Sequence, residues 1–167
     1  MSTASKHPIE EDDDLDAQKD KYLTFHIASE DYGIAIVHVT EIIGMQRITQ
    51  VPKTPAFIKG VINLRGKVIP VMDVRLRFRM PGRDYDERTC IIVVQHNDAT
   101  VGLVVDPVSE VLDIPTGAIE ACSAISRDQD NFVSGMGKVG DSIKMLIDVH
   151  RLLFDDTLEK MANGQNA

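Results

Sequence analysis

The chain has 167 residues, 43% of them hydrophobic and 26% charged, which is the composition of a folded globular domain and not of a disordered chain. Its 18 basic and 26 acidic residues leave a net charge of −8, so a nucleic-acid-binding surface, which would be basic, is not expected. Because the chain has no signal-peptide-like start, no long apolar run and no CxxC pair around its two cysteines, we expect a reduced cytoplasmic protein without direct membrane insertion.

The negative charge is concentrated at the two ends of the chain. Residues 1–20 hold seven acidic residues and two lysines, with few large apolar side chains, so we expect an acidic disordered tail. Residues 155–167 are rich in small and polar residues and are expected to form a C-terminal tail. The folded domain is therefore predicted to span residues 21–154, where acidic and basic residues nearly balance.

Short apolar runs rich in Val and Ile follow one another through this domain, separated by Gly, Pro, Asn and Asp. Runs of this length and composition favour strands over helices, so a mostly β fold with short helices is predicted. The predicted strands are Tyr22–Ala28, Gly33–Val37, Phe57–Leu64, Lys67–Met72, Cys90–Gln95, Val101–Val105, Val108–Ile114, Phe132–Val139 and Ile143–Ile147. The predicted short helices are His38–Ile43, Asp73–Phe78 and Asp148–Phe154.

An internal repeat relates the two halves of the domain. A shift of 69 residues aligns residues 33–43 with 102–112, and a shift of 75 residues aligns residues 57–74 with 132–149. Two small twisted sheets of about five strands each are expected, closed or nearly closed to hide their edges, with a groove between them. The repeat units are predicted to span about residues 21–80 and 88–154.

Motifs that would support catalysis or metal binding fit a structural role better. Gly135, Gly137 and Gly140 match G-x-G-x-x-G, but no helix is predicted at this loop to bind a pyrophosphate, so a β-hairpin is predicted instead. The five histidines are widely spaced and have no H-x-x-x-H pattern. Cys90 begins an apolar run, which does not activate a thiol. We therefore expect no enzymatic activity, no metal and no cofactor.

Four arginines, Arg75, Arg77, Arg79 and Arg83, form the basic cluster of the sequence. A nucleic-acid site would need a longer basic face and more aromatic residues. The favoured interpretation is a solvated turn with a few ion pairs, and contact with an acidic partner is left open.

The turn Asn63-Leu64-Arg65-Gly66 places a guanidinium at a predicted hairpin tip. In the second repeat unit the equivalent residue is Gly140, so the fold does not need an arginine there. The alternative is a structural hairpin whose arginine is merely solvated. The difference between the two units favours a binding role for Arg65.

Three motifs are distinctive in their order and spacing. They are Tyr32-Gly33-Ile34, the run PAFIKGVINLRG from Pro55 to Gly66, and the run VGLVVD from Val101 to Asp106. Through these motifs the chain resembles the CheW family of bacterial chemotaxis coupling proteins, over about residues 21–154. The resemblance implies two five-stranded SH3-like β-barrels with a hydrophobic groove between them, and neither enzymatic activity nor a cofactor.

Members of that family join the cytoplasmic tips of methyl-accepting chemotaxis receptors to the histidine kinase CheA, whose regulatory domain shares the fold. The resemblance therefore implies a scaffold of chemotaxis signal transduction that is cytoplasmic and recruited to membrane-associated receptor arrays. Two alternatives stay open. One is a CheW-like adaptor of a non-flagellar signalling array, and the other is a small-molecule-binding barrel that uses the groove between the barrels.

The resemblance also implies site residues. A receptor helix would lie between Val39 and Val108, with Arg65 hydrogen-bonding at the rim and glycines permitting close approach. A kinase-facing loop aligns with residues 120–125, where well-known members carry a basic residue and a Phe at the positions of Glu120 and Ile125. The predicted receptor-binding residues are Val39, Glu41, Gly60, Arg65, Gly102 and Val108, and the predicted kinase-binding residues are Glu120 and Ile125.

Overall fold

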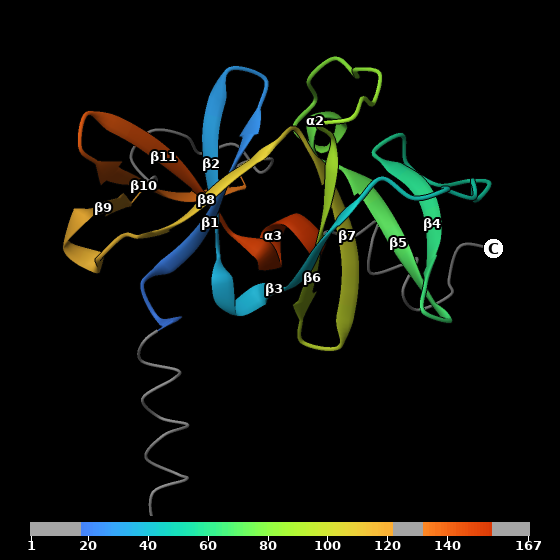
Figure 1. Ribbon diagram of the computed structural model, residues 1–167, viewed down its shortest axis with the longest axis horizontal. Helices are drawn as coiled ribbons and strands as arrows, with labels where there is room; N and C mark the ends of the chain where they lie inside the picture. Colours follow the sequence, from blue (N-terminus) through green and yellow to red (C-terminus); the bar gives the residue numbers. More distant parts are fainter. Residues whose placement is uncertain (1–17, 122–131, 155–167) are drawn as a thin grey trace, which may run out of the picture.

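The computed structural model describes residues 18–121 and 132–154, and it has a mostly β fold of two sheets that lie side by side (Figure 1). The strands are β1 (Lys21–Ile27), β2 (Glu30–Ala35), β3 (Val39–Gly44), β4 (Ile58–Leu64), β5 (Lys67–Asp73), β6 (Cys90–His96), β7 (Ala99–Val105), β8 (Val108–Asp113), β9 (Ile119–Ala121), β10 (Val133–Val139) and β11 (Ser142–Ile147). The helices are η1 (Ile36–His38), α2 (Val74–Arg77), η2 (Thr116–Ala118) and α3 (Val149–Leu153). The predicted strands are confirmed, except that Ile36 and Val37 lie in η1 and not in a strand. The predicted helices after Asp73 and Asp148 are also confirmed. Both helices begin at an Asp whose carboxylate accepts a backbone N–H of the first turn.

β3 is where the sequence prediction fails. A helix was predicted over residues 38–43, and this prediction is wrong because Val39–Gly44 is a strand paired with β6. Four of its first five residues are β-branched, which favours extended backbone over helix. Partly buried and exposed residues alternate along it, as in a strand with one covered face.

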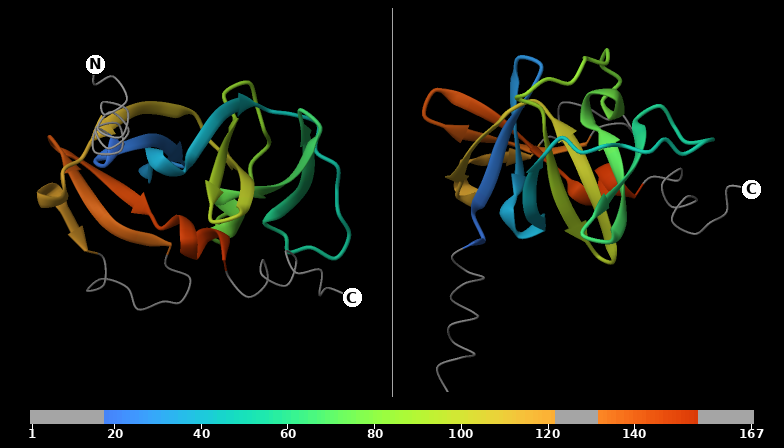
Figure 2. Two further views of the ribbon diagram at one scale, coloured as in Figure 1. Left: turned by 90° about the horizontal axis from the view of Figure 1, so that it is seen from below. Right: turned by 45° about the vertical axis from the view of Figure 1, so that its right-hand side comes forward.

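The two repeat units exchange strands. The six-stranded sheet has the order β8-β1-β2-β11-β10-β9, and the five-stranded sheet has the order β3-β6-β7-β5-β4. The first unit therefore supplies β1 and β2 to one sheet and β3, β4 and β5 to the other, and the second unit does the reverse (Figure 2). The short strand β9 brings the first sheet to six strands where five were predicted.

The sheets share one buried core. Phe25 and Ile34 of the six-stranded sheet belong to the same apolar cluster as Ile92 and Leu103 of the five-stranded sheet and Leu152 of α3. α3 lies between the two sheets (Figure 1). A second, smaller apolar cluster is formed by buried side chains of the five-stranded sheet alone. The two sheets thus pack against each other along one contact, the seam, and the shared core lies within it.

The arginine cluster holds this seam together. Arg77 on α2 is buried, donates from Nε to the carbonyl oxygen of Leu152 at 3.2 Å, and lies between the rings of Phe57 and Phe132 at 4.6 and 4.4 Å. The favoured interpretation of a solvated turn is therefore wrong for this residue. A guanidinium at the C-terminal end of α3 satisfies carbonyl groups that the helix leaves unpaired.

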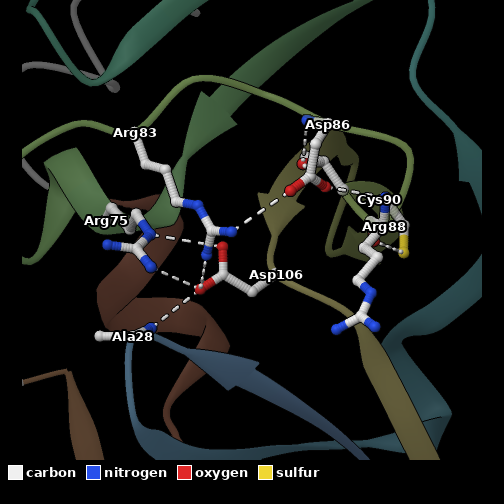
Figure 3. Close-up of polar contacts among 8 residues, drawn as sticks. Ala28, Arg75, Arg83, Asp86, Arg88, Cys90 and Asp106 are labelled. Carbon is white, nitrogen blue, oxygen red and sulfur yellow. Dashed lines mark hydrogen bonds and ion pairs between the residues drawn. The ribbon is translucent and has the colours of Figure 1, made fainter.

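A second arginine of the cluster closes another part of the seam. Arg75 donates from Nε and Nη2 to the Asp106 carboxylate at 3.3 and 2.6 Å, and this carboxylate also accepts the backbone N–H of Ala28 at 2.9 Å (Figure 3). Arg83 lies 3.9 Å from Asp106 and 3.2 Å from Asp86. Asp106 thus joins the β1–β2 turn, α2 and the end of β7.

Candidate functional site

The β4–β5 hairpin presents Arg65 at its tip. Arg65 and Gly66 form a two-residue turn with φ of +52° and +87°, and the Asn63 side chain accepts the N–H of Gly66 at 2.8 Å. These dihedrals are those of a hairpin turn that favours Asn-Gly, and an arginine in the left-handed region costs roughly 1 kcal/mol. Gly140 has φ of +59° in the equivalent turn between β10 and β11. Arg65 therefore occupies a backbone position that suits glycine or asparagine better.

Arg65 is held by Glu41 on β3. Nη1 of Arg65 donates to Oε1 of Glu41 at 3.1 Å, and Nη2 donates to Oε2, so the pair is bidentate. Arg65 lowers the pKa of Glu41, and Glu41 raises the pKa of Arg65, mainly through this side-chain hydrogen bonding. The Arg65 side chain is still 70% exposed. The pair thus orients an accessible guanidinium at the surface of the five-stranded sheet.

Gly60 lies beneath this surface. A Cβ built on Gly60 would stand 2.1 Å from the carbonyl oxygen of Thr49, because the segment after β3 returns to pair Thr49 with Val61. The same arrangement recurs in the other barrel, where a Cβ on Gly135 would stand 2.8 Å from the carbonyl oxygen of Glu120. Gly60 therefore permits the close approach of the chain's own backbone and closes the barrel.

Gly102 is also buried. It lies on β7, and a Cβ there would stand 2.8 Å from the side chain of Ile91 on β6. Both predicted receptor-binding glycines thus shape the five-stranded sheet from within.

Val39 and Val108 begin the two strands that follow the crossovers between the sheets. Val39 pairs with Val94 on β6, and Val108 pairs with Phe25 on β1. Both are partly buried against the shared core. The two valines hold equivalent places in the two repeat units, but five of the six predicted receptor-binding residues lie in or at the five-stranded sheet and Val108 lies in the six-stranded sheet.

Glu120, predicted to bind the kinase, lies on β9 at the edge of the six-stranded sheet. Its carboxylate is 2.7 Å from Nζ of Lys138 on β10, and both side chains are exposed. Hydrogen bonding to Lys138 lowers the pKa of Glu120. Ile125 lies outside the described residues. Glu120, which stands where well-known family members carry a basic residue, therefore has a basic neighbour on the next strand.

Sequence reasoning missed one cluster of titratable side chains. His38, His96 and His150, which looked widely spaced, are brought together, with ring centroids 5.0 and 5.4 Å apart between successive pairs. Among residues 18–121 and 132–154, no group of three or more His, Cys, Asp or Glu side chains is arranged to hold a metal ion. Within the same residues, no helix is long and apolar enough to span a bilayer.

Comparisons with known proteins agree with this architecture. The family described as CheW-like domain matches residues 21–156. The chain is 36% identical to chemotaxis protein CheW of Klebsiella aerogenes, over 86% of this chain and 87% of that protein, and 31% identical to chemotaxis protein CheW of Bacillus subtilis, over 87% and 94%. The crystal structure of the scaffolding protein TtCheW from Thermoanaerobacter tengcongensis superposes with a TM-score of 0.76 at 37% identity, over 83% of this chain and 94% of that one.

Proposed function

Because this chain belongs to the CheW family of chemotaxis proteins, we propose that it is a scaffold that joins the cytoplasmic tips of methyl-accepting chemotaxis receptors to a CheA-type histidine kinase. The scaffold acts by binding alone, without catalysis or a cofactor, and it works in the cytoplasm at receptor arrays. The small-molecule alternative is not favoured, because side chains fill the shared core and the core of the five-stranded sheet. Receptor state then reaches the kinase through a shared, rigid adaptor.

The observation that carries the receptor side of this proposal is the pair of Arg65 and Glu41. The pair orients an exposed guanidinium at a turn position where the second repeat unit has glycine. A bidentate donor held in one orientation loses little side-chain freedom when it binds a partner carboxylate or carbonyl. In this proposal Val39 on β3 and Val108 across the seam supply apolar contacts beside Arg65. Gly60 and Gly102 allow the close packing within the sheet beneath them.

The kinase side of the proposal uses the other sheet. Glu120 and Lys138 form an exposed charged pair on β9 and β10, and Ile125 follows Glu120 by five positions in the sequence. In this proposal the receptor surface lies mainly on the five-stranded sheet, and its one residue in the six-stranded sheet, Val108 on β8, is at the edge opposite to β9. The two docking surfaces are therefore separate, so that a receptor and a kinase bind at the same time. The shared core supports this arrangement because it ties the two sheets into one body.

The test measures binding of the purified chain to a receptor cytoplasmic fragment and, separately, to CheA. We expect both to bind, and Arg65→Asn to lower receptor affinity by about tenfold or more while leaving CheA affinity and the melting temperature unchanged, because asparagine suits this turn. Lys53→Asn is the matched control, since Lys53 is also an exposed cation with positive φ (+62°) and lies outside the site. Wild-type affinity in Arg65→Asn would contradict the receptor surface, and no binding of the folded chain to either partner would contradict the function.

A further inference from the structure

Three histidines from distant parts of the sequence meet at the seam between the sheets. His38 ends η1, His96 ends β6 and His150 lies on α3. The rings of His38 and His96, and those of His96 and His150, each pack edge to face at 71°. Phe154 packs beside two of them, with its ring 5.7 Å from that of His96 and 5.1 Å from that of His150. His96 is therefore the central member, in contact with every other ring.

The internal repeat allows the histidine cluster to be compared with the Arg75–Asp106 ion pair on the other side of the seam. The shifts of 69 and 75 residues put Val37 at the position equivalent to Asp106, and His150 at the position equivalent to Arg75. Arg75 and Asp106 form an ion pair at 2.6 Å on their side of the seam. On the equivalent side the contacts are made by imidazole rings, and imidazole is the side-chain type whose charge ordinarily changes between about pH 5 and 8.

The cluster is directly connected to the proposed receptor surface. η1 is the crossover from β2 in the six-stranded sheet to β3 in the five-stranded sheet. Val39 is the next residue after His38, and its amide donates to the carbonyl oxygen of Ile36. A displacement of His38 therefore moves Val39 and the start of the strand that carries Glu41.

Protonation changes the interactions within the cluster. Neutral aromatic rings pack favourably edge to face, whereas imidazolium groups about 5 Å apart at a partly buried site repel each other. Burial lowers the pKa of His38, and the neighbouring His96 lowers it further. The hydrogen bond to the backbone of Gln95 and the carboxylate of Asp148 raise it in part.

The other charged groups around the cluster are few among the described residues. Asp148 accepts the backbone N–H of Arg151 and is also 3.8 Å from its side chain, so this carboxylate is shared. Asp98 lies in the β6–β7 turn, two residues after His96. His38 binds a proton less tightly in the folded chain than in the unfolded chain, because its pKa is lowered. The neutral His38 therefore supports the folded state fully above about pH 6.5, and the free energy of unfolding decreases as the pH falls below that value.

We propose that His38, His96 and His150 form a proton-sensitive latch on the crossover that carries Val39. With neutral rings the crossover is held in the position that docks a receptor helix, and protonation in mildly acidic cytoplasm loosens it. Acidification thus weakens receptor engagement through the chain itself. The receptor step of this inference rests on the proposed function, whereas the loosening of the crossover does not.

The loosening is tested by hydrogen exchange of the Val39 amide at pH 7.5 and pH 5.5, corrected for the intrinsic exchange rate at each pH. We expect protection in the wild-type chain to fall about tenfold at pH 5.5, because protonation of the cluster loosens the crossover. In His96→Gln and in His150→Gln, an exposed position on α3, protection should change less than threefold. His26→Gln is the control, because His26 lies on β1 next to Asp31, outside the cluster, and this variant should behave as the wild type.

The receptor step is tested with the same four proteins and a receptor cytoplasmic fragment at both pH values. Wild type and His26→Gln should lose about tenfold in affinity at pH 5.5, while His96→Gln and His150→Gln lose less than threefold. An equal loss in all four proteins, or no loss in the wild type, would overturn the latch. Absence of binding at either pH would contradict the proposed function instead, and the exchange measurement would still decide whether the crossover responds to protons.

Discussion

Some single residues at the hairpins allow the barrels to close, and others present side chains to solvent. Gly60 and Gly135 leave room for the backbone that closes each barrel, at Thr49 and Glu120 respectively. Arg65 does the opposite, since it accepts an unfavourable φ and projects an exposed side chain. The resemblance implies receptor contact for both Gly60 and Arg65. Gly60 is buried and the Arg65 side chain is exposed, so in the proposed function Arg65 makes the direct contact.

Gly60→Ala should be strongly destabilising. Its Cβ would stand 2.1 Å from a backbone carbonyl oxygen, so either the Thr49–Val61 pairing or the β4 bulge must give way, and we expect a loss of about 3 kcal/mol in the free energy of unfolding. Gly44→Ala on β3 is the matched control, since no atom lies within 4 Å of its Cβ, and should change stability by less than about 0.5 kcal/mol. Urea unfolding of both variants measures the difference, and equal stabilities would show that Gly60 does not serve closure.

At the scale of elements, the strand pattern of this chain is readable from sequence because apolar runs and turn residues alternate regularly. The prediction failed at β3, where the polar residues His38, Thr40 and Glu41 obscured a β-branched run, although its repeat partner β8 was predicted correctly. The role of Arg77 could not be predicted, because its partners Leu152 and Phe132 come from the other repeat unit. For the same reason the histidine cluster was missed. Contacts across the seam depend on strand exchange, which local patterns do not encode.

The contact of α2 with α3 predicts a large effect of Arg77→Met. Methionine keeps an apolar stem between Phe57 and Phe132 but leaves the Leu152 carbonyl without its guanidinium donor, so we expect a loss of about 2–3 kcal/mol. Arg77→Lys should recover only part of this stability, because an ammonium group cannot stack as a planar guanidinium does. Thermal unfolding compares both with Arg47→Met at an exposed position, and a loss no larger than that of Arg47→Met would refute the role in the seam.

For the whole molecule, strand exchange makes one cooperative unit out of two sequence repeats. β3 of the first unit is hydrogen-bonded to β6 of the second, and β8 of the second unit to β1 of the first. The apolar cluster that joins the sheets draws on both units. The repeat was visible in the sequence, but the pairing of its copies was not, because a shift in the alignment says nothing about which sheet a strand joins.

This topology predicts that the chain unfolds in a single transition and that neither repeat unit folds alone. We expect calorimetry of the full chain to give equal calorimetric and van't Hoff enthalpies. Fragments of residues 21–80 and 88–154 should each lack a cooperative transition, and mixing them should restore one by completing both sheets. A fragment that melts cooperatively by itself would contradict the account of strand exchange.

The proposed function is that one adaptor links receptor state to kinase activity. It is tested most directly by measuring CheA autophosphorylation with receptor fragments in ligand-free and ligand-bound states, with and without the chain. We predict that the kinase responds to receptor state only when the chain is present, and that Arg65→Asn weakens this response whereas Lys53→Asn does not. A kinase that responds equally without the chain, or that ignores receptor state when the folded chain binds both partners, would contradict the account.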